Sequence, residues 1–301
     1  MESKRLMIFG CGYVGRSLAK ATAEAGWEVW IHSRNAKSLA EVNEIPTERR
    51  IIGNLHEDEW QSRLKGQWDA VVNLVSSAGG GLEGYKLSYL EGNRSIRAWA
   101  EEAAVRRFIY SSATSVYPQT EGEWVSEDDV PEMNHLSPSG AVLREAELEI
   151  LQSDIFPERV VARLAGIYGP GRHLYLNRLQ EGAQSLPGDG SAWLNLIYLK
   201  DIVTALIQLL DAPMPNVAEV FNVVDDEPAR KQEIVDWLAT KLGLPTIPFN
   251  PDDLGPRASR RTTQGGLPNR RVSNAKLKES IGWKPSHPSF REGYADILKG
   301  R

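Results

Sequence analysis

Three glycines near the N-terminus, Gly10, Gly12 and Gly15, have GxGxxG spacing between an apolar run, RLMIF, and a helical pattern. In such a loop the first glycine permits a tight turn, the second lets the backbone approach a pyrophosphate, and the third allows close helix–strand packing. The N–H groups of the helix N-terminus then face the phosphates. We therefore predict dinucleotide contacts from Gly10, Cys11, Gly12, Tyr13, Val14 and Gly15, the alternative being a glycine turn without a ligand.

The end of the next apolar run, EVWIH, indicates which dinucleotide binds. A carboxylate at this place holds the ribose 2′-hydroxyl of NAD, but here the chain has Ser33 followed by Arg34. The Arg34 guanidinium can pair with a 2′-phosphate in bidentate fashion, and the Ser33 hydroxyl can donate to it. The sequence therefore predicts NADP(H) over NAD(H), the alternative being that Arg34 is an ordinary surface arginine.

Alternating strand and helix patterns position this loop. The apolar runs RLMIFG, EVWIH, RRIIGNL, DAVVNLVS, RFIYS and RVVARLAGIYG are expected strands, and helical patterns follow the first, the fourth and the fifth. Near-continuous apolar strands alternating with helices are typical of a parallel sheet covered on both faces. The predicted fold is α/β, a Rossmann-type doubly wound parallel sheet with a smaller C-terminal substrate lobe.

The alternation of strand and helix patterns becomes less regular after the first half of the chain. We expect the dinucleotide-binding domain to cover residues 1–168, and we expect residues 193–212, which include LNLIY and a helix, to return to it. Residues 169–192 and 213–301 are the expected smaller lobe, in which Pro and Gly are denser.

Composition limits the classes of partner. The 301 residues carry a net charge of −5 and a single cysteine, Cys11, so no internal disulfide can form. Together with a charged N-terminus and no long apolar segment, this predicts a cytoplasmic protein without a nucleic-acid or membrane partner. The five histidines have no metal-ligand spacing, so no metal site is predicted.

Arginines gather in the expected second lobe. Arg172 follows a Gly-Pro-Gly turn, and five more lie between positions 257 and 271, namely Arg257, Arg260, Arg261, Arg270 and Arg271. They are candidates for an anion clamp on a phosphate or carboxylate substrate. A flexible basic loop is the alternative. Gly265 and Gly266, between the arginine groups, favour mobility, as in a loop that closes over a ligand.

Several segments, in order, resemble the extended short-chain dehydrogenase/reductases, the group of the nucleoside-diphosphate-sugar epimerases and dehydratases. Besides the glycine loop they are Gly53-Asn54-Leu55, Asn73-Leu74-Val75-Ser76, Asn93, FIYSSATSVYP, ARLAGIYGPGR, NLIYLKDI and the C-terminal RRVSNAKLKESIGWKPSHPSFREGY. The resemblance covers nearly the whole chain. It implies further cofactor contacts from Asn54, Leu55, Val75, Ser76 and Ser77, and a homodimer as in many members.

The segment SPSGAVLREAE departs from that family. Members usually have a Tyr here and a Lys four residues later, which exchange the substrate proton and hold the nicotinamide ribose. This chain has Ser139 and Leu143 instead, and Ala113 stands where the family has a catalytic serine. The pattern resembles the atypical branch of the family, which lacks the Tyr–Lys pair.

Other residues are candidates for the lost roles. Proton transfer is assigned to Ser112, Thr114, Tyr117 or His135, and substrate contacts are assigned to Arg172, Tyr198 and Arg261. A solvated loop is the alternative for His135, and packing is the alternative for Tyr117, Tyr168 and Tyr198.

Two functional hypotheses remain. The first is an NADP(H)-dependent oxidoreductase or epimerase-like enzyme with a non-standard proton donor, acting on a small substrate such as a nucleotide sugar or a carbonyl compound. The second is a non-catalytic NADP(H)-binding sensor or scaffold, and a purely structural role for NADP(H) is a third possibility. The second lobe favours the enzyme, because a protein that only holds a cofactor needs no substrate pocket.

Overall fold

The computed structural model describes residues 3–77, 79–214, 216–253, 255 and 266–300. The chain divides into two compact units. The first comprises Met1–Ala113, Ala141–Arg163 and Ile202–Phe221; the second comprises Thr114–Gly140, Leu164–Asp201 and Asn222–Arg301. Residues 114–140, which the sequence analysis assigned to the dinucleotide-binding domain, belong to the second unit. Within the described part, no helix is long and apolar enough to cross a membrane.

A seven-stranded sheet with the order β12-β7-β5-β4-β1-β2-β3 forms the centre of the first unit. The pairs β1–β2, β1–β4, β2–β3 and β4–β5 are parallel. The predicted doubly wound α/β fold is therefore confirmed. The strands are β1 (Arg5–Phe9), β2 (Glu28–Ser33), β3 (Arg50–Ile52), β4 (Trp68–Asn73), β5 (Val105–Ala113), β7 (Glu158–Leu164) and β12 (Ala218–Val223).

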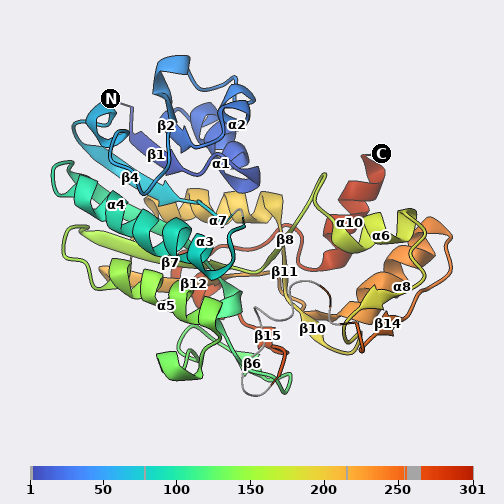
Figure 1. Cartoon of the computed structure of the whole chain (residues 1–301). Helices are drawn as coiled ribbons and strands as arrows, with labels where there is room; N and C mark the ends of the chain where they lie inside the picture. The colour runs from blue at the N-terminus through green and yellow to red at the C-terminus, as the bar shows by residue number, and fades with distance from the viewer. Residues whose placement is uncertain (1–2, 78, 215, 254, 256–265, 301) are drawn as a thin grey trace. The chain divides into compact units, whose positions relative to one another are not determined.

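Helices cover both faces of this sheet, with α4 and α5 on one face and α1 and α7 on the other (Figure 1). This explains the continuous apolar strands: Leu6, Met7, Ile8 and Phe9 of β1 are all buried. The helical elements are α1 (Tyr13–Glu24), α2 (Ala36–Ala40), η1 (Thr47–Arg49), η2 (Gln61–Arg63), α3 (Gly81–Tyr85), η3 (Lys86–Glu91), α4 (Gly92–Ala100), α5 (Pro138–Leu151) and α7 (Leu199–Asp211).

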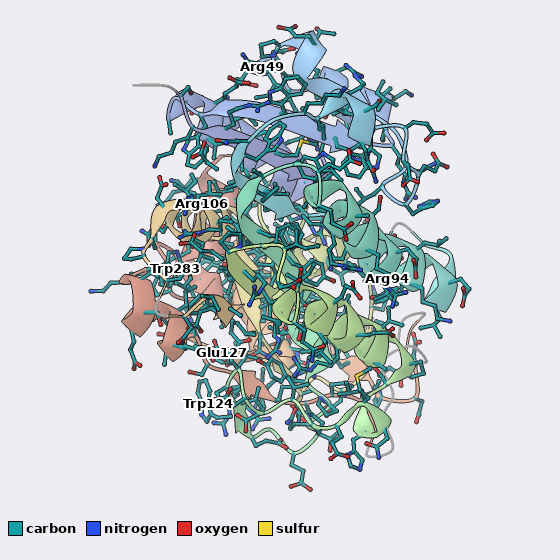
Figure 2. The ribbon with its side chains drawn as sticks, turned by 90° about the vertical axis from the view of Figure 1, so that its left-hand side faces the viewer. Arg49, Arg94, Arg106, Trp124, Glu127 and Trp283 are labelled. Carbon is teal, nitrogen blue, oxygen red and sulfur yellow. The ribbon has the colours of Figure 1, made fainter. Side chains whose placement is uncertain are left out.

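The helix after β4 begins earlier than expected. Sequence patterning places it at about residues 85–105, but α3, the π-helical segment η3 and α4 follow one another without a break from Gly81 to Ala100. The three glycines 79–81 hid this start, because glycine disfavours helix interiors. Arg94 of α4 contacts Glu145 and Glu149 of α5, and Figure 2 shows it beside that helix.

Two strands were expected in the wrong sheets. The strand of LNLIY, β11 (Leu196–Tyr198), does not join the main sheet but pairs with β8 (Gly166–Tyr168). Conversely β12, expected in the smaller lobe, is an edge strand of the main sheet. The run RVVARLAGIYG is two strands, β7 and β8, interrupted at Ala165. Apolar runs of this length fit either sheet equally well, so the sequence could not decide between them.

The second unit consists of short elements around its own apolar cluster. Residues from α6, α8, α10, β8 and β11 form this cluster. The elements are β6 (Trp124–Val125), β9 (Leu186–Pro187), β10 (Trp193–Leu194), β13 (Ala229–Arg230), β14 (Phe249–Asn250), β15 (Arg271–Val272), α6 (Leu174–Gln180), α8 (Lys231–Leu242), α9 (Ala275–Ile281), α10 (Phe290–Lys299), η4 (Thr114–Val116) and η5 (Met133–His135).

Candidate functional site

The β1–α1 loop is shaped for close approach of a ligand. Gly10 has φ +98°, and a Cβ there would lie 2.6 Å from the Val75 nitrogen, so only glycine fits. A Cβ on Gly15 would lie 1.9 Å from the Gly10 carbonyl oxygen, which shows how tightly α1 packs against the turn. Gly12, in contrast, faces open space, since no atom lies within 4 Å of its would-be Cβ. The loop thus has an open side for a ligand.

The N-terminus of α1 suits an anion. Gly12 is its N-cap residue and supplies no side-chain cap, and the first turn carries no acidic residue. The N–H groups at this end and the helix dipole therefore favour a phosphate there. The amides of Gly10 and Cys11 donate to the His32 carbonyl at 2.9 and 3.2 Å, which ties the loop to the end of β2. These residues fit a dinucleotide pyrophosphate.

Cys11 is a buried loop residue. Burial raises the pKa of its thiol to about 11, against smaller lowering by Arg16 and Arg50. Its Sγ donates to the Ser38 carbonyl at 3.4 Å. A thiol in this state is a poor nucleophile, so the geometry favours a packing role beside the loop.

At the end of β2, the Ser33 Oγ accepts from the Asn35 amide at 3.1 Å, and the Asn35 side chain caps α2 by accepting from Lys37. Arg34 is exposed between them and makes no ion pair with any other residue in the described ranges. A guanidinium on this short, capped turn is available to an anionic ligand.

The ends of β3 and β4 supply the other predicted cofactor residues. The Asn54 amide donates to Glu57 at 2.8 Å, and Leu55 is buried. After β4, the Asn73 side chain accepts from the Val75 amide at 3.0 Å and donates to Asn93 at 2.7 Å. Asn93 in turn donates to the Ala146 carbonyl at 3.2 Å. This buried amide ladder fixes the β4 end to α4 and α5.

Ser112 is built into a buried ion pair. Its Oγ donates to Glu147 Oε1 at 2.7 Å, and Arg163 donates to both carboxylate oxygens of Glu147 at 2.9 and 2.8 Å. Glu147 and Arg163 are 0% and 1% exposed. The hydroxyl proton of Ser112 is therefore used inside the fold, which favours a structural role for this candidate.

The other proton-transfer candidates lie in the second unit. The Tyr117 hydroxyl donates to Asn222 Oδ1 at 2.7 Å in the core. The Thr114 carbonyl accepts from Arg270 at 2.6 Å. His135 is exposed, at the end of η5. Within the described ranges, neither the Thr114 hydroxyl nor the His135 ring is held by a hydrogen bond.

Ser139 and Leu143 lie one turn apart on α5. The Ser139 and Ser137 hydroxyl oxygens are 3.5 Å apart, and Ser137 Oγ accepts from the Gly140 amide at 3.2 Å, so Ser137 caps the first turn. Leu143 is 1% exposed. An apolar side chain buried at this position supplies neither a charge nor a proton.

Of the predicted substrate residues, Arg172 is exposed and its backbone bridges to Gly169. Tyr198 is buried, with its ring 4.1 Å from the His287 ring and 5.3 Å from the Tyr168 ring, centroid to centroid. Arg261 lies outside the described residues, as do Arg257 and Arg260. Arg270 and Arg271 are partly or fully buried and donate to the carbonyls of Thr114 and Gly122.

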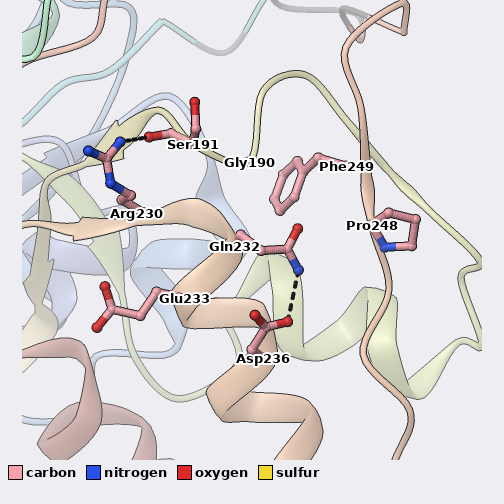
Figure 3. A pocket seen from close by; sticks show the side chains of 8 residues that line it. All are labelled: Gly190, Ser191, Arg230, Gln232, Glu233, Asp236, Pro248 and Phe249. Carbon is pink, nitrogen blue, oxygen red and sulfur yellow. Dashed lines mark hydrogen bonds between the residues drawn. The ribbon is translucent and has the colours of Figure 1, made fainter.

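The second unit also has an open pocket of about 620 Å³ between α8 and β14 (Figure 3). Gly190 keeps it open, because a Cβ there would lie 2.8 Å from the Phe249 ring. Two of its polar side chains already have partners in the lining: Gln232 donates to the Asp236 side chain at 2.8 Å, and Arg230 donates to the Ser191 backbone carbonyl. No predicted site residue lines it, and we assign it no role.

His32 was missed by the sequence analysis because it lies inside an apolar strand. Its ring is buried against Phe9 and Trp60, and neither ring nitrogen has a hydrogen-bond partner in the described part of the chain. Burial lowers the pKa of His32 to about 4. The ring is therefore neutral at neutral pH.

We expect His32 to weaken the fold in acid. The unfolded chain binds the His32 proton at about pH 6.5, so its contribution to stability is present above that pH and is lost as pH falls toward 4. The loss reaches about 3 kcal/mol at 1.4 kcal/mol per pKa unit. Urea titrations at several pH values should show His32→Leu losing less stability than wild type over this range. Parallel curves for the two proteins would contradict the assignment.

Asp225, just after β12, is a second buried group that sequence reasoning missed. It is 2% exposed, and neither carboxyl oxygen makes a hydrogen bond of standard geometry to a described residue. Burial, and then the charges of Asp226 and Glu227, raise the pKa of Asp225 well above its usual range, against smaller lowering by the Glu227 amide. The fold therefore favours the neutral form of this carboxyl group.

Because its folded pKa is raised, Asp225 contributes stability below about pH 4 that is lost as pH rises through the folded value. An Asp225→Asn variant cannot ionise. We expect it to be more stable than wild type at pH 8 by at least about 1 kcal/mol, because the raised pKa makes ionisation unfavourable only for the wild-type side chain, with the difference closing toward pH 4. Thermal unfolding at the two pH values measures this, and a variant less stable at pH 8 would show that Asp225 is ionised and paired.

Comparison with known proteins identifies the class. The sequence profile of the NAD dependent epimerase/dehydratase family matches residues 6–223, more than half of the chain. The chain belongs to this family, which confirms the resemblance seen in its motifs. The family is described as NAD dependent, in agreement with the geometry of the glycine loop.

Three similar proteins are each less than 30% identical to this chain. The chain is 29% identical over 218 residues to the 3-diazoavenalumate denitrifying reductase of a Streptomyces species, covering 67% of this chain and 68% of that protein. It is 27% identical over 249 residues to the Escherichia coli protein YeeZ, covering 80% and 85%. UDP-glucuronic acid 4-epimerase from Bacillus cereus, solved with UDP-glucuronic acid and NAD, superposes with a TM-score of 0.80 at 19% identity, covering 98% and 99%. This last likeness shows the shared fold.

Proposed function

We propose that the protein is an NADP(H)-dependent reductase of a small substrate that works without the Tyr–Lys pair of its family. The observation that carries the cofactor choice is Arg34, exposed and unpaired in the described structure at the end of β2, beside Ser33 and without a carboxylate at that strand end. A guanidinium recognises a 2′-phosphate, whereas a carboxylate at that place would repel it.

The residues of the first unit would hold the cofactor as follows. The amides at the start of α1 bind the pyrophosphate, Arg34 and Ser33 bind the 2′-phosphate, and the β3 and β4 ends enclose the adenosine half. A bound reduced nicotinamide supplies a hydride. The chain's own part is to orient that group and exclude water from it.

Reduction suits this chain better than epimerisation. Epimerisation through a keto sugar begins by removing a hydroxyl proton, which needs a base such as the missing tyrosine. Reduction needs only a proton source, and Thr114 and His135 keep side chains free of hydrogen bonds to other described residues. One curated relative is also named a reductase. Thr114 and His135 are therefore the proposed proton donors, and Arg172, Tyr198 and Arg261 remain proposed substrate contacts.

A non-catalytic sensor is the second candidate, and one observation favours it. Ser139 and Leu143 replace the pair that performs the family's proton exchange, and Leu143 is buried. A dinucleotide-binding protein without turnover could tolerate both changes. A homodimer and a cytoplasmic location belong to either proposal.

Deuterium transfer separates the two candidates. The protein is incubated with NADPH deuterated at nicotinamide C4 and with 3-diazoavenalumate, nucleotide sugars and simple carbonyl compounds in turn. The reductase proposal predicts deuterium in one reduced product by mass spectrometry, with less transfer from deuterated NADH. Tight NADPH binding without transfer to any of these compounds would support the sensor.

A further inference from the structure

The turn after β4 is rich in glycine and shares one close approach with the glycine loop after β1. Gly79, Gly80 and Gly81 have φ angles of +125°, +77° and +60°. A Cβ on Gly84 would lie 1.9 Å from the Gly79 carbonyl oxygen, the same separation as between Gly15 and the Gly10 carbonyl oxygen. Glycines have no side chains that could hold such a turn in place. They also lose more conformational entropy on folding than other residues do. Some other residue must therefore fix it.

Contacts at Ser77 meet this need. The Ser77 amide donates to the Tyr89 Oη at 3.2 Å, and the Ser77 hydroxyl donates to the Gly79 carbonyl at 3.0 Å. Burial raises the pKa of Tyr89, against lowering by the Ser77 amide, so the phenol is neutral at neutral pH. Tyr89 thus accepts at one end of the segment, while Asn73 accepts from the Val75 amide at the other.

The helical segment that carries Tyr89 places its side chain beside Ser77. Tyr89 lies in the π-helical segment η3, between α3 and α4. π-Helical turns are rare and are found frequently at functional sites. Tyr85, one turn earlier, contacts the Tyr89 ring edge-on at 5.1 Å and has no hydrogen bond to Ser77 among the described residues. It is a matched control for the loss of a phenol oxygen.

We propose that Tyr89 is a positioning residue for the cofactor, because it fixes the segment Val75–Ser77 as one wall of the dinucleotide site. The inference rests on the proposed function. Ser76 lies between the hydrogen-bonded amides of Val75 and Ser77, and its side chain is exposed. When the Tyr89 oxygen is removed, the Ser77 amide loses its partner and the glycine turn beyond it is free to move.

The test compares Tyr89→Phe with Tyr85→Phe. Calorimetry measures the Kd for NADPH, thermal unfolding measures the Tm, and hydrogen exchange is followed at the Ser77 amide without cofactor. Tyr89→Phe should raise the Kd about 3- to 10-fold, as expected for one lost hydrogen bond, and should speed exchange at Ser77. Its Tm should match that of Tyr85→Phe, whose Kd and exchange should equal those of wild type.

Two failures are distinguishable. If wild type binds NADPH and Tyr89→Phe binds it equally well, the inference is wrong and the proposed function stands. If wild type binds neither NADPH nor NADH, the proposed function is wrong and the inference falls with it. A Tyr89→Phe variant with a much lower Tm and unchanged exchange at Ser77 would show that Tyr89 only packs, which also overturns the inference.

Discussion

A Gly12→Asp variant folds as wild type does but binds NADPH about 10- to 30-fold more weakly, because its carboxylate takes the place of the phosphate at the helix N-terminus, an effect of up to about 2 kcal/mol. Gly12 has φ −89°, which any residue adopts, and no atom lies within 4 Å of its would-be Cβ. The new side chain therefore costs no strain. An N-cap aspartate accepts from backbone N–H groups in the first turn of its helix, so the Tm should stay the same or rise.

Gly12→Asn is the matched control. Asparagine has the same size and the same capping ability but no charge, so its effect on the Kd should be smaller than that of aspartate. Calorimetry with NADPH gives the three Kd values. Equal affinity of Gly12→Asp and wild type would place the pyrophosphate elsewhere.

Replacing Glu147 with alanine should destabilise the protein by about 3–5 kcal/mol, the usual cost of leaving one charge of a buried ion pair without its partner. Arg163 is 1% exposed and donates to both Glu147 oxygens, and Ser112 and Arg144 also contact this carboxylate. Removing the carboxylate takes the opposite charge away from the buried Arg163 guanidinium. Denaturant titration followed by tryptophan fluorescence measures the change in unfolding free energy.

Glu145→Ala, on the same helix, is the control. Glu145 is half-exposed and contacts Arg94 at 3.4 Å, so its loss should cost less than about 1 kcal/mol. If both variants lose the same stability, the Glu147–Arg163 pair does not hold the first unit together in the way its burial indicates.

The sequence predicted the parts of the site that depend on local rules. Gly10, Gly12 and Gly15 were recognisable because a phosphate loop needs glycine at fixed spacing, and the strand before them has continuous apolar character. The same reasoning could not assign β11 and β12 to sheets, because pairing partners distant in the sequence leave no local signal. It also gave no indication of the π-helical turn at Lys86–Glu91, which keeps an ordinary helical composition.

Buried polar groups were the main omission. Glu147 fits the charged face of a predicted helix, His32 ends an apolar run, and Asp225 is the first of three acidic residues that follow another. Their burial depends on side chains brought from other elements, such as Arg163 from β7. Ser112 was predicted as a proton donor for the same reason: the sequence does not show that its hydroxyl is already bound to Glu147.

The most direct test of the central claim is calorimetric titration of wild type and Arg34→Ala with NADPH and with NADH. If the Arg34 guanidinium holds a 2′-phosphate, wild type binds NADPH at least about 10-fold more tightly than NADH, a difference of about 1.4 kcal/mol. Arg34→Ala should remove that preference and leave the NADH Kd unchanged. Tighter binding of NADH by wild type, or an equal loss of both affinities in the variant, would contradict it.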